Sequence, residues 1–298
     1  MMLVHGNALL ALLAALLWGG GDFSGGMGVK RAGGSMGAAV RVVLLSHVMS
    51  LCVLLAVARW RGDSFPHGAA LGWGLVAGGT AGIALSCFYI ALSRGAMGAS
   101  AALSGLLAAA IPAVVSGMVE GSPGLLRMVG FGVAGLAIWM IAAGPAEEAG
   151  AADSAGTMGL ALVGGVGFGF YFVGLKMAGS AGVIWPLATA RMGSVTVAAL
   201  LLAGLTWRES GGSGGESRVR LTRSAVIWVA ATALLDTSGN LLFLAATRAG
   251  RLDVAAVLAS LYPASTILMA AWVLRERPTL RQGLGMAAAA VAVVMITL

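Results

Sequence analysis

Two acidic residues and an arginine interrupt stretches of the sequence that are otherwise apolar. Asp22 lies about 15 residues into the apolar segment 7–29, and Asp236 lies near the middle of segment 224–247. Arg191 lies about eight residues into a third apolar segment, 183–206. An acid at such a depth costs about 2.5–3.5 kcal/mol on membrane-insertion scales, so it rarely faces lipid. It pairs with a cation, faces a wet cavity or stays protonated.

These three side chains each have a functional and a structural interpretation. As functional groups, Asp22 and Asp236 would bind a proton, a cation or a substrate, whereas as structural groups they would be hydrogen-bonded by neighbouring hydroxyls and backbone. Arg191 could be the counter-charge of either acid or an anion contact, or it could extend its guanidinium to the helix end. His47, also in an apolar segment, could relay protons or simply be hydrogen-bonded.

A polar stripe and two aromatic residues favour a cavity around the acids. Thr232, Asp236 and Asn240 recur at every fourth position and therefore share one helix face. Trp18 precedes Asp22 by one helical turn, and Tyr262 belongs to a further apolar segment. We expect these residues to line a substrate or proton site. Interhelical hydrogen bonds and ordinary packing are the alternatives.

The composition places the whole chain in a membrane. Of its 298 residues 59% are hydrophobic and only 10% are charged, against about 25% charged in soluble domains. The apolar residues form runs long enough to cross a bilayer as helices. We predict an all-α integral membrane protein with ten transmembrane helices, near residues 7–29, 36–58, 68–92, 96–119, 124–144, 156–178, 183–206, 224–247, 252–274 and 278–298.

Glycines at every fourth position predict where these helices pack closely. Gly74, Gly78 and Gly82 form such a series, as do Gly21 with Gly25. Small residues at this spacing let two helix backbones approach each other in lipid.

The two halves of the chain resemble each other. Residues 91–95 (ALSRG) resemble residues 245–249 (AATRA), and Pro112 and Pro263 interrupt corresponding segments, where we expect helix kinks. Five helices per half is an odd number, so the second copy enters the membrane from the opposite side. We predict a first five-helix repeat at 1–144, a linker at 145–155 and a second, inverted repeat at 156–298.

Several short motifs resemble the EamA family of the drug/metabolite transporter (DMT) superfamily. They are residues 235–243 (LDTSGNLLF), 260–263 (SLYP), 273–277 (VLRER), 282–283 (QG) and, in the first half, 18–23 (WGGGDF). The resemblance implies ten helices, a central cavity between the repeats and transport of small metabolites, often outward. The first half departs from it, because it has no Leu-Tyr-Pro tripeptide before Glu120.

The resemblance and the composition together predict a secondary transporter that exports a small molecule, coupled to protons, by alternating access. A flippase for a lipid-linked substrate is the alternative, with Arg191 as the deep basic residue that it needs. A membrane-embedded enzyme is disfavoured, since the sequence offers no nucleophile–base set, no HExxH or GxSxG motif and no phosphate-binding loop. We expect no catalytic residue, metal, cofactor or nucleic-acid partner.

The location follows less directly from the sequence. We expect a multi-pass protein of the plasma membrane. The family resemblance places both termini in the cytoplasm, whereas the distribution of Lys and Arg over the loops favours the opposite orientation. The sequence does not decide between a monomer and a homodimer, and it identifies no substrate.

Overall fold

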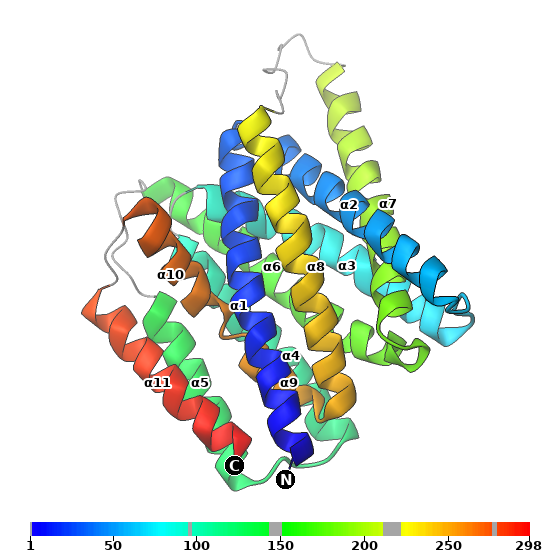
Figure 1. Cartoon of the computed structure of the whole chain (residues 1–298). Helices are drawn as coiled ribbons and strands as arrows, with labels where there is room; N and C mark the ends of the chain where they lie inside the picture. Colours follow the sequence, from blue (N-terminus) through cyan, green and yellow to red (C-terminus); the bar gives the residue numbers. More distant parts are fainter. Residues whose placement is uncertain (1, 95–96, 143–150, 211–221, 276–278) are drawn as a thin grey trace.

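The computed structural model describes residues 2–94, 97–142, 151–210, 222–275 and 279–298. All regular elements in these residues are helical (Figure 1). They are α1 (Met2–Arg31), α2 (Met36–Arg61), α3 (Ala69–Ser93), α4 (Met97–Val119), α5 (Leu125–Ala142), α6 (Ala151–Ala178), the short 3-10 helix η1 (Gly179–Ala181), α7 (Ile184–Ser210), α8 (Arg223–Ala249), α9 (Leu252–Ala259), α10 (Tyr262–Leu274) and α11 (Leu280–Thr297).

Most of these helices are long enough to cross a membrane. Within the described residues, eight segments have the length and apolar composition of a span, and the segment Leu252–Val273 among them contains both α9 and α10. Two shorter apolar helical stretches, Leu103–Val119 and Leu125–Ile141, account for the other two predicted spans. The all-helical membrane fold is thus confirmed, whereas the inverted ten-helix arrangement stays a prediction.

The outer surface of the bundle is apolar, as a lipid environment requires. Trp60, Trp207 and Trp272 are 85%, 82% and 80% exposed, and each lies near one end of its helix. Tryptophan is typical of the membrane–water interface at helix ends. Large aliphatic side chains are exposed along most of the other helices as well.

The two prolines expected to kink their helices behave differently. Pro263 stands in the first turn of α10, where its missing N–H costs no hydrogen bond, and the chain breaks between α9 and α10 at Ser260 and Leu261. Pro112 lies inside α4, which continues through it without a break. Glu276, within the motif 273–277, and residues 145–150 of the predicted linker lie outside the described residues.

The helices pack in pairs that join the two halves of the chain. α1 lies along α8, α3 packs on α6 and α7, α2 packs on α7, and α5 packs on α11. Figure 1 shows α1 and α8 side by side at the centre, α5 and α11 at one edge, and both chain ends at the same end of the molecule.

Glycines set the closest of these approaches. A Cβ on Gly78 would collide with the backbone of Ala190, and one on Gly82 would lie 3.1 Å from the Ser194 carbonyl oxygen. The glycine face predicted on α3 is therefore a packing face for α7. Between α1 and α8, a Cβ on Gly21 would lie 3.3 Å from the backbone nitrogen of Asp236. Asp22 and Asp236 consequently lie at similar depth on adjoining helices.

Candidate functional site

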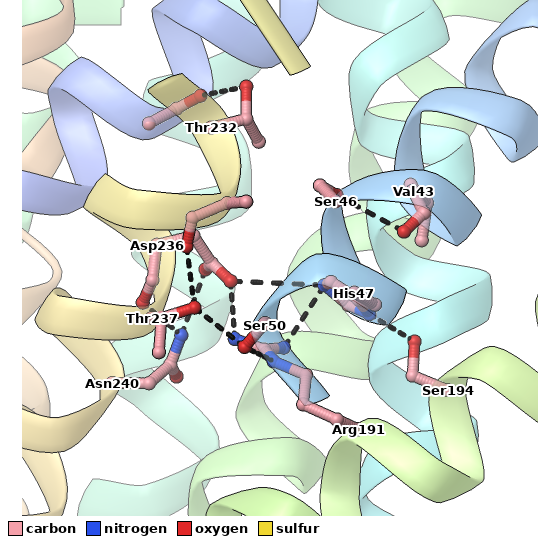
Figure 2. Close-up of polar contacts among 12 residues, drawn as sticks. Val43, Ser46, His47, Ser50, Arg191, Ser194, Thr232, Asp236, Thr237 and Asn240 are labelled. Carbon is pink, nitrogen blue, oxygen red and sulfur yellow. Dashed lines mark hydrogen bonds and ion pairs between the residues drawn. The ribbon is translucent and has the colours of Figure 1, made fainter. Parts of the chain in front are cut away.

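The close packing of α7 on α3 places Arg191 in the interior. Its side chain is 1% exposed and points toward α2 and α8 (Figure 2). One terminal nitrogen of the guanidinium donates to Oδ2 of Asp236 on α8. The geometry therefore decides between the two possible counter-charges of Arg191, because the partner is Asp236.

The guanidinium is also bonded by two residues of α2. Its Nε donates to Ser50 Oγ over 3.1 Å, and the second terminal nitrogen lies 3.0 Å from His47 Nε2. Ser50 Oγ in turn lies 2.6 Å from Thr237 Oγ1. All of the guanidinium nitrogens thus have partners in the interior of the bundle. Together with Ser194 and Asn240, whose contacts follow, these residues form what we call the buried polar cluster: His47, Ser50, Arg191, Ser194, Asp236, Thr237 and Asn240.

The contact with Arg191 fixes the tautomer of His47. An arginine only donates hydrogen bonds, so His47 Nε2 must accept and carries no proton. The other ring nitrogen, Nδ1, lies 2.5 Å from Ser194 Oγ and is the protonated one. His47 is therefore neutral in this arrangement, although Nε2 lies only 3.8 Å from Asp236 Oδ2.

The polar stripe of α8 completes the cluster. Asn240 Nδ2 donates to Asp236 Oδ1 over 2.8 Å, and Asn240 Oδ1 accepts from the Tyr171 hydroxyl over 2.7 Å. Thr232, the third member of the stripe, donates to the carbonyl of Trp228 within its own helix and lies 3.4 Å from the carbonyl of Gly21. Asp236 thus has partners on both carboxylate oxygens.

A small cavity adjoins this cluster and is lined by both halves of the chain. Its lining residues are Trp18, Asp22, Ala81, Leu85, Phe168, Tyr171, Phe172, Arg191, Asp236, Asn240 and Tyr262. The volume is about 30 Å³, which holds only about one or two water molecules. The cavity has to widen before an organic molecule could enter.

Asp22 differs from the other charged residues of the cavity. It is partly buried, and it has no hydrogen-bond or ion-pair partner among the described residues. The hydroxyl of Tyr262 is also unpaired there, although the residue is only 3% exposed. The cavity therefore contains a carboxylate and a phenol group that have no partner among the described residues.

Aromatic rings form much of the remaining wall. Trp18 stacks on Phe172 with the ring centroids 5.0 Å apart and the planes inclined by 4°. Phe172 also contacts Phe243 at 4.6 Å and Tyr171 at 5.8 Å. Tyr262 meets the edge of Phe88 at 6.3 Å.

The six residues predicted to bind a substrate or proton all line this cavity. They are Trp18, Asp22, Arg191, Asp236, Asn240 and Tyr262. Of the kink residues, neither Pro112 nor Pro263 lies in the lining, although α10 begins beside it with Tyr262.

Sequence reasoning did not find every residue of the site. Ser50, Ser194 and Thr237 donate or accept hydrogen bonds within the cluster, and Phe168 and Phe172 line the cavity. None of them is singled out as a site residue by the sequence alone. Serines, threonines and phenylalanines are common in apolar helices, and only their spacing relative to Arg191 and Trp18 in three dimensions distinguishes these. No group of three or more metal-binding side chains occurs within the described residues.

A second set of charged groups joins the halves at the end that holds the termini. Glu120 Oε1, after α4, lies 3.5 Å from Lys176 Nζ of α6. Arg251, before α9, donates to the backbone oxygens of Glu120 and Gly121 over 3.1 and 2.7 Å. Arg251 also pairs with the buried Asp253 over 2.7 Å. These contacts close this end of the bundle between the two halves.

The fold and site together define a multi-pass helical membrane protein with an acidic, aromatic cavity in its interior. The family model of the EamA-like transporter family matches residues 155–298. This part of the chain belongs to that family and hence to the DMT superfamily. The resemblance is thereby confirmed for the motifs of the second half, and family and fold indicate a DMT-type transporter.

The wider comparisons support the fold alone. One solved structure, described as "Crystal structure of protein", superimposes with a TM-score of 0.71, covering 97% of this chain and 95% of the other at 16% sequence identity. No curated protein is similar enough to this sequence to match.

Proposed function

We propose that the protein is a secondary transporter that exports a small metabolite across the plasma membrane by alternating access, coupled to protons. One observation carries the proposal: both halves of the chain line an interior cavity that holds the carboxylate of Asp22, for which the described residues provide no partner. An ionisable residue inside a membrane protein commonly marks a substrate or proton path.

The helix pairing supports an origin from two inverted repeats, at 1–144 and 156–298. If α1 corresponds to α6 and α3 to α8, a two-fold exchange turns the α1–α8 pair into the α6–α3 pair, and both pairs pack closely. The same exchange relates the packing of α4 against α6 to the packing of α9 and α10 against α1, and both are present. The match of the family model from residue 155 agrees with the second boundary.

Alternating access needs contacts that break when the halves rock against each other. Glu120 and Lys176, with Arg251, supply such contacts at the end that holds both termini. We place this end in the cytoplasm, so these contacts would open for loading and close before release.

The proton would bind at Asp22 rather than at Asp236. Asp236 accepts from Arg191 and Asn240, whereas Asp22 has no partner among the described residues. A carboxylate without partners is free to exchange a proton for a substrate. The flippase alternative gains no support, because Arg191, its deep basic residue, is 1% exposed and paired with Asp236.

Export can be tested by untargeted mass spectrometry of the medium. Cells would express the wild type, Asp22→Asn, Asp236→Asn or an empty vector, with matched membrane levels of the proteins. We expect one class of metabolite to accumulate outside with the wild type and not with Asp22→Asn. Indistinguishable media for the wild type and the empty vector, together with indistinguishable uptake, would contradict the proposal.

A further inference from the structure

We infer that the cavity recognises a monovalent organic cation, with the Asp22 carboxylate as its counter-charge and the rings of Trp18, Tyr171 and Phe172 as its walls. The inference rests on the proposed function, in that the cation would be the transported molecule. It assigns different roles to the two acids: Asp22 binds the cation, and Asp236 serves Arg191.

The charge balance of the cavity determines the charge of the ligand. Three residues of the lining carry formal charges, namely Asp22, Asp236 and Arg191. Asp236 and Arg191 form an ion pair and cancel each other. His47, behind them, accepts a hydrogen bond from Arg191 and is neutral.

When Asp22 releases its proton, one negative charge remains in the cavity. An anion would be repelled by it, and a neutral ligand would bury it without a partner, which is costly in a low-dielectric interior. A single positive charge neutralises it.

The unpaired phenol of Tyr262 is an independent sign that the cavity receives an occupant. Buried hydroxyls nearly always have a hydrogen-bond partner, and this one, in a residue 3% exposed, has none among the described residues. A bound molecule or water within the cavity would provide that partner. Tyr262 belongs to α10, at the break between α9 and α10, so the second half of the chain presents it to Asp22 on α1.

The aromatic walls suit a cation. The face of an aromatic ring attracts positive charge, most strongly where water is excluded. Trp18 and Phe172 are stacked in parallel, at a centroid distance of 5.0 Å, and fill the space that a ligand would need. Trp18 belongs to α1 and Phe172 to α6, so a cation that separates these rings also moves the two halves apart.

The inference can be tested with a matched set of probes on the purified full-length protein in detergent. Phenyltrimethylammonium carries one positive charge, tert-butylbenzene has nearly the same shape without charge, and benzoate carries a negative charge. Isothermal titration calorimetry would measure the binding of each. We expect the cation to bind at least about tenfold more tightly than the neutral isostere, and benzoate not to bind.

Variants locate the site. We expect Asp22→Asn to weaken binding of phenyltrimethylammonium at least about tenfold, Asp22→Glu to retain most of it, and Phe172→Leu to weaken it without affecting tert-butylbenzene. Asp63→Asn is the matched control, since Asp63 pairs with Arg61 just after the end of α2 and is not among the lining residues of the cavity. Equal affinity of Asp22→Asn and the wild type, or equal affinity for the cation and its neutral isostere, would overturn the inference.

The binding test and the export test can fail separately. If the medium of wild-type cells accumulates a metabolite that is neutral or anionic, the cation assignment is wrong and the transport proposal stands. If the cation binds at Asp22 but no solute crosses the membrane in either direction, the site stands and the transport proposal is wrong.

Discussion

Asp22 and Asp236 lie at similar depth on adjoining helices and line the same cavity, yet their hydrogen-bond partners differ. Asp236 accepts hydrogen bonds from Arg191 and Asn240, and it belongs to a cluster that binds α2, α7 and α8 together. Asp22 lies in the cavity beside aromatic rings and has no partner in the described part of the chain. Asp236 is thus bonded by neighbouring side chains, whereas Asp22, a residue of the same type at similar depth, is bonded by no described residue.

We therefore expect Asp236 to contribute to the stability of the fold and Asp22 to contribute to binding and transport. A buried ion pair is hard to break, because removing one partner leaves a buried charge uncompensated. An unpaired acid contributes nothing comparable to stability and is retained for another reason. The comparison therefore predicts that substitutions in the cluster destabilise the fold, and that substitution of Asp22 affects binding and transport.

The ion pair should give the largest effect on stability. We expect Arg191→Met or Asp236→Leu to lower the free energy of unfolding by about 3–5 kcal/mol, since each leaves a buried charge. The double variant should lose less free energy of unfolding than the two single variants lose together, because it removes both charges. Unfolding in detergent micelles, followed by circular dichroism, measures all three, and strictly additive losses would mean that the pair is not coupled.

The packing of α7 on α3 should give the next largest effect. Gly78→Ala adds a methyl group against the backbone of Ala190 and would displace Arg191 from the cluster. We expect a loss of about 2–3 kcal/mol. Gly79→Ala is the control, since its methyl group would meet only Val197 at 3.6 Å, and it should stay within about 0.5 kcal/mol of the wild type. Similar losses for both would show that this packing does not position Arg191.

His47 should contribute less than either. His47→Ala leaves one N–H group of Arg191 and the Ser194 hydroxyl without their partner. We expect a loss of about 1–2 kcal/mol in the free energy of unfolding, measured in the same micelles. Ser46→Ala, one position earlier on α2, is a useful control because, within the described residues, its hydroxyl bonds to the carbonyl of Val43 alone. An unchanged His47→Ala protein would argue against the hydrogen bonds assigned to the imidazole.

Asp22 should give the smallest effect on stability. Asp22→Asn removes a charge that no described residue compensates, so we expect the free energy of unfolding to change by less than about 0.5 kcal/mol or to rise. Asp236→Asn, which leaves Arg191 without its counter-charge, is the matched comparison. Thermal unfolding of both variants would measure the contrast. A large loss for Asp22→Asn would show that Asp22 is structural and would remove the basis of the comparison.

The sequence by itself determined the membrane fold. Apolar runs of span length, the scarcity of charge and the glycine series predicted a helical membrane protein with a close α3 packing face, and family motifs predicted its membership. The spacing of Thr232, Asp236 and Asn240 placed a polar stripe on one face of α8, and Pro263 marked an interruption of segment 252–274, which the structure shows as a break between α9 and α10. These features follow from local periodicity, chain length and proline chemistry.

The tertiary structure alone decided which acid is paired. From the sequence, Arg191 could have paired with Asp22 or Asp236, because both acids lie deep in apolar segments and no periodicity distinguishes them. The choice depends on the rotation of α7, which the contact of Gly78 with Ala190 fixes, and on α2, which supplies Ser50 and His47. Contacts between helices this distant in the sequence depend on three-dimensional register, which the residues of any one helix do not encode.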